Sequence, residues 1–162
     1  MNIDKFEILK EKQTQLNKLK KEINQLSNDA FMDFIKVLFK KNPKLESFSW
    51  TQYTPYFNDG ESCVFSVNTD YIKINGEYAD EQDWISPKKI TNYGNWDVNT
   101  KKYVGREEIP NPDYDEELTK VTDEIRDFLS HFDEDFYHSQ YGDHVEITVT
   151  SQGVNISEHE HE

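Results

Sequence analysis

The sequence predicts an α+β domain, with an antiparallel sheet packed against helices and an amphipathic, coiled-coil-like helix at the N-terminus. Apolar residues recur at helical spacing before residue 43 and again between residues 118 and 132. Between and after these runs, apolar residues alternate along short segments that end in turn dipeptides. We therefore divide the chain into a helical arm (residues 1–28), an acidic aromatic domain (29–157) and a frayed tail (158–162).

The first expected element is a helix over residues 3–26, a stretch without Gly or Pro. Its apolar residues fall at seven-residue spacing and at the alternate position between, as in a short coiled-coil seam. We expect this seam to mediate self-association and give a homodimer, with packing on the chain's own domain as the alternative. The seam consists of Leu9, Leu16, Leu19, Ile23 and Leu26.

A second helix is expected after a break at Ser27, Asn28 and Asp29, which are typical helix-capping residues. Its apolar stripe runs from Phe31 to Phe39 at helical spacing and is typical of a core-facing helix. Pro43 is expected to stop it.

From residue 45 the period changes to two, and Phe48, Trp50 and Gln52 share one strand face. Asn58-Asp59-Gly60 predicts a turn, and the alternation over residues 63–68 predicts the returning strand of a hairpin. Cys63 is expected to be a small buried residue of that strand. A third strand over residues 71–74 is expected to end at the turn Asn75-Gly76.

Residues 79–117 are expected to form a long insertion, partly ordered by aromatic residues, with a small hairpin pairing 96–98 and 102–104. Pro112-Asp113 with Glu116 is typical of a helix start, and the apolar spacing continues this helix to Phe132. Clean alternation over residues 145–149 and a shorter run at 154–156 predict two last strands.

Charge is divided unevenly along the chain. Residues 1–50 carry ten Lys and seven Asp or Glu, a net of +3, whereas residues 51–162 carry eight Lys or Arg and twenty-five Asp or Glu, a net of −17, and the two sum to −14. This balance favours a protein partner with a basic surface over direct binding to nucleic acid or membrane. Cys63 is the only cysteine and the N-terminus has no apolar leader, so we expect a cytoplasmic protein.

Acidic residues concentrate between residues 113 and 135, on and beside the expected second-half helix. We predict that they form a partner-binding surface, either by mimicking the phosphates of DNA or by matching another basic protein surface. Simple solubility is the alternative. The predicted surface comprises Asp113, Asp115, Glu116, Glu117, Asp123, Glu124, Asp127, Asp133, Glu134 and Asp135.

The sequence contains no motif that points to catalysis, so we expect no enzyme activity, no cofactor and no bound metal. His131, Asp135 and His138 have helical spacing, but the neighbouring Phe132 and Phe136 indicate a packing helix. His159 and His161 lie in the predicted tail, where ordering a metal site is costly. A small metal-dependent hydrolase is kept as an alternative.

Residues 50–61, WTQYTPYFNDGE, resemble a motif of small phage and bacterial proteins of unassigned function. Its aromatic residues Tyr53, Tyr56 and Phe57 are candidate interface anchors. In size, acidity and its Lys-, Asn- and Ile-rich usage the chain is also similar to the inhibitors of host Lon protease made by T4-type phages. That resemblance implies a dimeric, non-enzymatic inhibitor of an ATP-dependent protease.

Our leading hypothesis is therefore a non-catalytic, phage-type protein that inhibits a host enzyme by direct contact in the host cytoplasm, with a Lon-type protease as the best single target. The alternatives are a DNA mimic that blocks a nucleic-acid-processing defence enzyme, the hydrolase above, and a phage structural or assembly protein.

Overall fold

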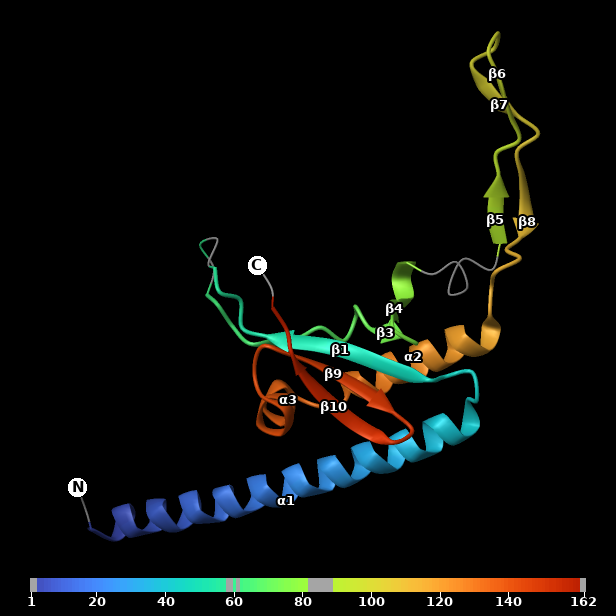
Figure 1. The fold of residues 1–162 in the computed structure, drawn as a ribbon. Helices are drawn as coiled ribbons and strands as arrows, with labels where there is room; N and C mark the ends of the chain where they lie inside the picture. The colour runs from blue at the N-terminus through green and yellow to red at the C-terminus, as the bar shows by residue number, and fades with distance from the viewer. Residues whose placement is uncertain (1–2, 58–59, 61, 82–88, 161–162) are drawn as a thin grey trace.

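The computed structural model describes residues 3–57, 60, 62–81 and 89–160 of the 162-residue chain, and its fold is α+β, as predicted. Three helices pack on one face of a six-stranded antiparallel sheet, and a narrow hairpin projects from the body (Figure 1). The helices are α1 (Ile3–Lys41), α2 (Glu116–Ser130) and α3 (Glu134–Tyr141), and η1 (Ala79–Glu81) is a short 3-10 turn. The main sheet consists of β1 (Ser47–Tyr53), β2 (Ser66–Val67), β3 (Lys73–Ile74), β4 (Glu77–Tyr78), β9 (Val145–Thr150) and β10 (Gly153–Glu158).

Helix α1 is a single helix of 39 residues, so the predicted break at Ser27, Asn28 and Asp29 is wrong. Ser, Asn and Asp lower helix propensity by only tenths of a kcal/mol each, and no Gly or Pro interrupts the run. The Asp29 carboxylate accepts a hydrogen bond from Gln25 one turn earlier, at 3.0 Å, instead of capping a new helix. The arm and the core-facing segment are therefore parts of one continuous rod (Figure 1).

Strand β1 lies at the centre of the sheet, between β9 on one side and β2 and β3 on the other. Phe48, Trp50 and Gln52, which are predicted to share one strand face, are all buried, and Ser49 between them is also buried at 5% exposure. Strand β9 pairs with β1 over six residues, with Trp50 opposite Ile147. The two predicted last strands, β9 and β10, pair as a hairpin that turns at Ser151 and Gln152.

The predicted hairpin between β1 and the segment after residue 60 forms, but it is shorter than expected. Only Ser66 and Val67 pair with β1, whereas Cys63 lies before the strand and is exposed. The prediction that Cys63 is a buried strand residue is therefore wrong. Asn75 and Gly76 form the expected turn with positive φ angles of 53° and 89°, joining β3 to β4. Asn58 and Asp59 of the other predicted turn lie outside the described residues.

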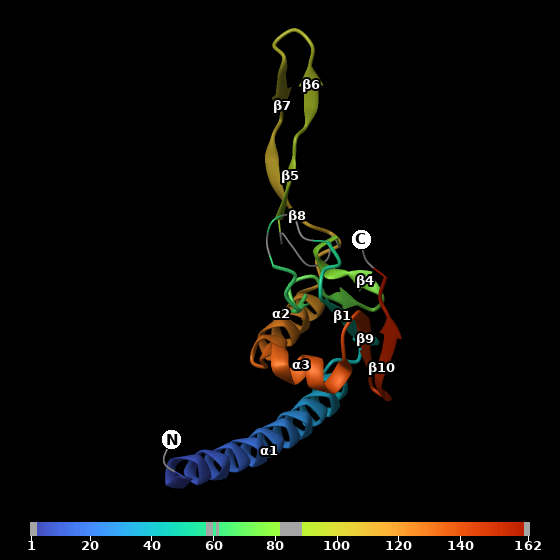
Figure 2. The ribbon, with the colours of Figure 1, turned by 90° about the vertical axis from the view of Figure 1, so that its left-hand side faces the viewer.

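The predicted insertion is a two-stranded arm that projects from the body in both views (Figures 1 and 2). The small hairpin predicted at its tip is confirmed as β6 (Asn95–Asp97) and β7 (Lys102–Val104). Below it, β5 (Lys89–Asn92) pairs with β8 (Glu107–Pro110). Gly94 joins the two ladders at φ +65°, where a Cβ atom would lie 2.1 Å from the Val104 carbonyl oxygen.

Aromatic residues from all three helices and β1 meet in the core, which also contains many aliphatic residues. Phe31 of α1 has its ring centroid 5.4 Å from Phe128, 5.8 Å from Phe132 and 6.0 Å from Trp50. Gln52 is a fully buried polar residue of this core, and its amide donates to the carbonyl oxygens of Tyr137 (3.1 Å) and Gly142 (2.6 Å). These bonds attach the end of α3 to the central strand.

Candidate functional site

The predicted self-association residues lie along the N-terminal part of α1, and all five side chains are exposed. Their relative accessibilities lie between 52% and 69%, although burying such apolar side chains against a second helix would be favourable. In the same helix, Phe31, Ile35 and Leu38 are at most 3% exposed. The structure thus keeps the predicted seam together on one helix and leaves it uncovered by the described part of the chain. The exposed seam consists of Leu9, Leu16, Leu19, Ile23 and Leu26.

A hollow of about 460 Å³ separates this part of α1 from the junction between α2 and α3. Leu16 and Ile23 line it on the α1 side, and Phe132 and Phe136 line it on the other. The exposed seam therefore borders a concave surface as well as open solvent. Polar residues complete the lining, namely Lys20, Asn24, Ser27, His131, Asp133 and Asp135.

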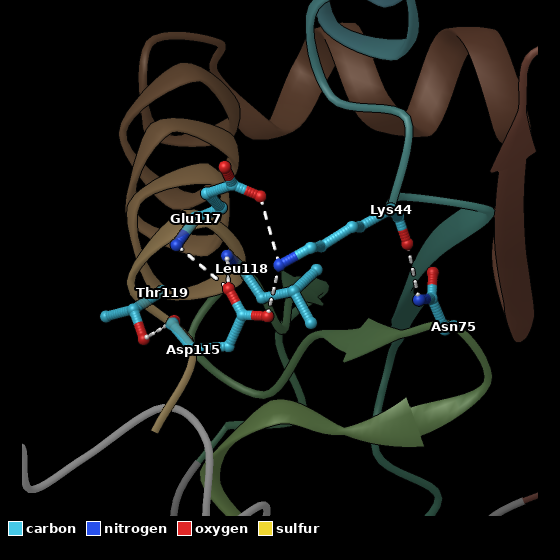
Figure 3. A network of polar contacts seen from close by, with 6 residues as sticks. All are labelled: Lys44, Asn75, Asp115, Glu117, Leu118 and Thr119. Carbon is cyan, nitrogen blue, oxygen red and sulfur yellow. Dashed lines mark hydrogen bonds and ion pairs between the residues drawn. The ribbon is translucent and has the colours of Figure 1, made fainter. Parts of the chain in front are cut away.

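Part of the predicted acidic surface is committed to internal contacts. Asp115, rather than Asp113, caps α2, because its side chain accepts from the backbone N–H groups of Glu117 (2.9 Å) and Leu118 (3.0 Å). Lys44 reaches Asp115 at 2.7 Å and Glu117 at 3.0 Å (Figure 3). The Lys44 ammonium and the backbone donors lower the pKa of Asp115, and the two carboxylates raise the pKa of Lys44.

The same network fixes the connection between α1 and the sheet. Asn75 donates from its side-chain amide to the Lys44 carbonyl oxygen at 2.9 Å (Figure 3). The Asn75 side-chain oxygen accepts from the backbone N–H groups of Glu46 (2.8 Å) and Ser47 (3.2 Å). Asp115 and Lys44 therefore serve the fold, whereas the Glu117 side chain remains 73% exposed while it contacts Lys44.

Other predicted acidic residues also have structural partners. Asp133 caps α3 by accepting from the Phe136 backbone N–H at 2.8 Å, and Glu116 pairs with Lys120 at 3.0 Å. The remaining carboxylates of the predicted surface are exposed; they lie before α2, along α2 and in the first turn of α3, where Asp135 also lines the hollow beside α1. These are Asp113, Asp123, Glu124, Asp127, Glu134 and Asp135.

The three aromatic anchor candidates differ in exposure. Tyr53 is half-buried on β1, with its ring centroid 5.6 Å from that of His159. Tyr56 and Phe57 lie in the following loop at 66% and 75% exposure, and the Tyr56 ring stacks on His144 at 4.6 Å. Tyr56 and Phe57 keep the exposure expected of interface anchors, whereas Tyr53 belongs to the sheet surface.

The histidines that we considered as metal ligands occupy other environments. His131 Nδ1 lies 2.6 Å from the Asp127 carbonyl oxygen, and the His138 ring packs edge-on against Phe65. His159 continues from β10, where its N–H donates to the His144 carbonyl oxygen at 2.8 Å. Among the described residues, no three His, Cys, Asp or Glu side chains gather as metal ligands. His161 lies outside the described residues.

A pocket that the sequence analysis missed lies on the face of the sheet opposite the helices. Its volume is about 400 Å³, within the range of ligand pockets. Alternation along β1 places Thr51 and Tyr53 on this face, because Trp50 and Gln52 face the core. That alternation was the available signal, but the other wall comes from segments whose pairing the sequence did not reveal. The pocket is lined by Thr51, Tyr53, Asn68, Tyr71, Tyr78, Asp80, Glu81 and His159.

Comparison of the chain with models of known protein families, with curated proteins and with solved structures gives no match. None of the helices in the described residues has the length and apolar character needed to cross a membrane.

Proposed function

We propose that this protein acts without catalysis, by binding another protein directly, and that it does so as a homodimer. The observation that carries this proposal is the exposed seam on α1, from Leu9 to Leu26. An uncovered row of Leu and Ile is costly in water, and a protein surface that covers it supplies the stabilisation.

A second copy of the chain is the best match for this seam. Leu16 and Ile23 recur seven residues apart and Leu19 and Leu26 fill the alternate position, which is the pattern by which two identical helices interlock. Lys and Glu flank the seam, with pairs such as Lys10–Glu7 and Lys18–Glu22 at 3.3 and 4.0 Å. Because the residues on either side of the seam are charged, the contact between the two helices is expected to be limited to the apolar seam residues.

Light scattering at micromolar concentration tests the dimer. The parent chain is expected to show twice the mass of one chain, and the double variant Leu16→Ser, Ile23→Ser the mass of one. Val37→Ser is the matched control, because Val37 is an exposed apolar residue of the same helix outside the seam. A parent mass equal to one chain would refute the dimer.

For the target, we propose a host enzyme with a basic surface, and an ATP-dependent protease of the Lon type as the first to test. The net charge of −14 and the exposed carboxylates on α2 and α3 support a basic partner. Tyr56 and Phe57 supply exposed aromatic side chains of the kind that anchor interfaces. The resemblance to phage Lon inhibitors supports the choice of target.

The experiment is degradation of a model substrate by purified Lon protease in the presence of increasing amounts of this protein. We expect inhibition that weakens at high salt and in the triple variant Asp123→Asn, Glu124→Gln, Asp127→Asn. A control that removes carboxylate charges from the N-terminal part of α1, Glu7→Gln with Glu11→Gln, is expected to leave inhibition unchanged. Full protease activity at saturating protein would exclude this target.

A DNA mimic remains the second candidate, supported by the exposed Asp123, Glu124 and Asp127 along one helix. Under this function, duplex DNA competes with the protein for its target, whereas an inhibitor that binds away from the DNA channel is insensitive to added DNA.

A further inference from the structure

The open face of the main sheet carries the residues of the new pocket. Strand β1 contributes Thr51 and Tyr53 to this face, and β4 contributes Tyr78. Tyr78 pairs with Lys73 on β3, which in turn lies beside Ser49 of β1. Three tyrosines from separate segments therefore converge on one hollow, because Tyr71 precedes β3 and lines the same pocket.

Two carboxylates form the acidic wall of this pocket, Asp80 and Glu81 of η1. Asp80 is held in place by Arg126 of α2, whose Nη2 lies 2.6 Å from the Asp80 carboxylate and also donates to the Asp70 carbonyl oxygen at 3.0 Å. Because Asp80 is already paired with Arg126, Glu81 is the carboxylate of this wall that disfavours an anion. Tyrosine rings carry negative charge on their faces, so the three rings and Glu81 together attract a cation.

The protein already uses this chemistry beside the pocket. Lys73 places its ammonium 5.1 Å from the centroid of the Tyr78 ring and 2.8 Å from the Glu146 carboxylate. The bond to Glu146 raises the pKa of Lys73, which keeps its charge in place. On this sheet face an ammonium thus lies between a tyrosine ring and a carboxylate.

We propose that the pocket binds the cationic end of an arginine or lysine side chain of the partner protein. The inference rests on the proposed protein-binding function and names the group that the partner inserts. Tyr71 and Tyr78 are 67% and 40% exposed and so accessible to an entering side chain, and the volume of about 400 Å³ accommodates one such side chain. Arginine suits the site best, because its planar guanidinium stacks on aromatic rings and bonds carboxylates at its edge.

Titration with N-acetyl-arginine amide, followed by NMR of the tyrosine rings, tests the pocket without the partner. We expect saturable shifts at Tyr53, Tyr71 and Tyr78, with a dissociation constant in the millimolar range, on the order of 1–10 mM for a single side chain. N-acetyl-citrulline amide has nearly the same shape without the charge and is expected to cause no saturable shift. Equal shifts with both probes, or none with the arginine probe, would overturn the proposal.

Two variants locate the binding. Tyr71→Ala and Glu81→Gln are each expected to weaken the arginine probe about two- to fivefold. Matched changes on the projecting arm, Tyr93→Ala and Glu107→Gln, are expected to leave it unchanged. Unaltered binding in both pocket variants would contradict the site even if the probe binds elsewhere on the acidic surface.

A free polyamine also carries ammonium groups, so titration with spermidine tests whether the pocket binds a polyamine rather than a protein side chain. Spermidine that saturates the three tyrosine shifts at least about tenfold more tightly than the arginine probe would overturn the side-chain assignment. If the arginine probe binds but no protein target is found, the proposed function fails and the pocket stands. If the target is bound equally well by Glu81→Gln, the pocket is not used in that contact.

Discussion

The two halves of α1 both carry apolar residues at helical spacing, but these residues are exposed in the N-terminal half and buried in the C-terminal half. Phe31, Ile35 and Leu38 are at most 3% exposed, whereas Leu16 and Ile23 on the same unbroken helix are more than half exposed. Spacing therefore makes a helix amphipathic, but the rest of the chain decides whether the apolar side finds a partner. We regard the buried half as part of the fold and the exposed half as surface available to a second molecule.

The largest expected effect breaks the buried half. Phe31→Ala removes a ring that contacts Trp50, Phe128 and Phe132, and leaves a cavity at the centre of the core. We expect the free energy of unfolding to fall by about 3–5 kcal/mol, measured by chemical denaturation. A loss below about 1 kcal/mol would mean that the C-terminal half of α1 is not packed on the sheet as described.

The second effect concerns the strand that the buried half covers. Gln52→Leu leaves the Tyr137 and Gly142 carbonyl oxygens without their donor and the Trp50 indole N–H, 3.3 Å from the Gln52 oxygen, without its acceptor. Because unsatisfied buried polar groups are costly, we expect a loss of about 1–3 kcal/mol despite the apolar replacement. Thr51→Val on the opposite face of β1 is the control and is expected to have a smaller effect.

A smaller effect is expected at the contact between Asp115 and Lys44, which follows the C-terminal end of α1. Asp115→Ala removes the cap of α2 and the partner of Lys44, and the free energy of unfolding is expected to fall by about 1 kcal/mol at neutral pH.

This contribution depends on pH in a defined direction. The folded-state pKa of Asp115 is lowered, so its stabilisation is present above the unfolded-state pKa of about 4 and is lost as the pH falls through the folded-state value. The difference between the parent and Asp115→Ala in denaturation experiments is therefore expected to shrink on acidification below about pH 4. A difference that grows in acid would contradict the Lys44–Asp115 pairing.

The smallest effect tests the exposed half. Leu16→Ala is expected to change the unfolding free energy of the monomer by less than about 0.5 kcal/mol, because the Leu16 side chain is 52% exposed in the single chain. The same substitution is expected to weaken self-association in dilution experiments. A monomer stability loss comparable with that of Phe31→Ala would show that the arm packs on its own domain.

Periodicity predicted the α+β class, the buried face of β1, and the tip hairpin, because these depend on alternation and local turn chemistry. Periodicity did not predict features that depend on contacts between residues far apart in the sequence. The break at Ser27–Asp29 did not occur, since nothing local forbids the helix and Phe31 fixes it from the core. The cap of α2 is Asp115 rather than Asp113, and Lys44, from the connection between α1 and β1, holds the Asp115 carboxylate.

The candidate sites divide in the same way. The seam on α1 was readable from its spacing, and its residues are together and exposed. The acidic surface was predicted from composition, which cannot separate Asp115 and Asp133 as helix caps from exposed residues such as Asp123. The tyrosine pocket was not predicted, because Tyr53, Tyr71 and Tyr78 meet only through sheet pairing and the turn at Asn75.

The unbroken passage of α1 through residues 27–29 has a consequence for how the arm becomes helical. Starting a helix in water is unfavourable, whereas adding residues to an existing one is nearly neutral. The segment from Phe31 to Leu38, ordered by the core, supplies that start, and residues before it need only propagate. Amide exchange in the isolated chain is therefore expected to slow progressively from the N-terminus toward Phe31, and a dimer would remove this gradient over the paired segment.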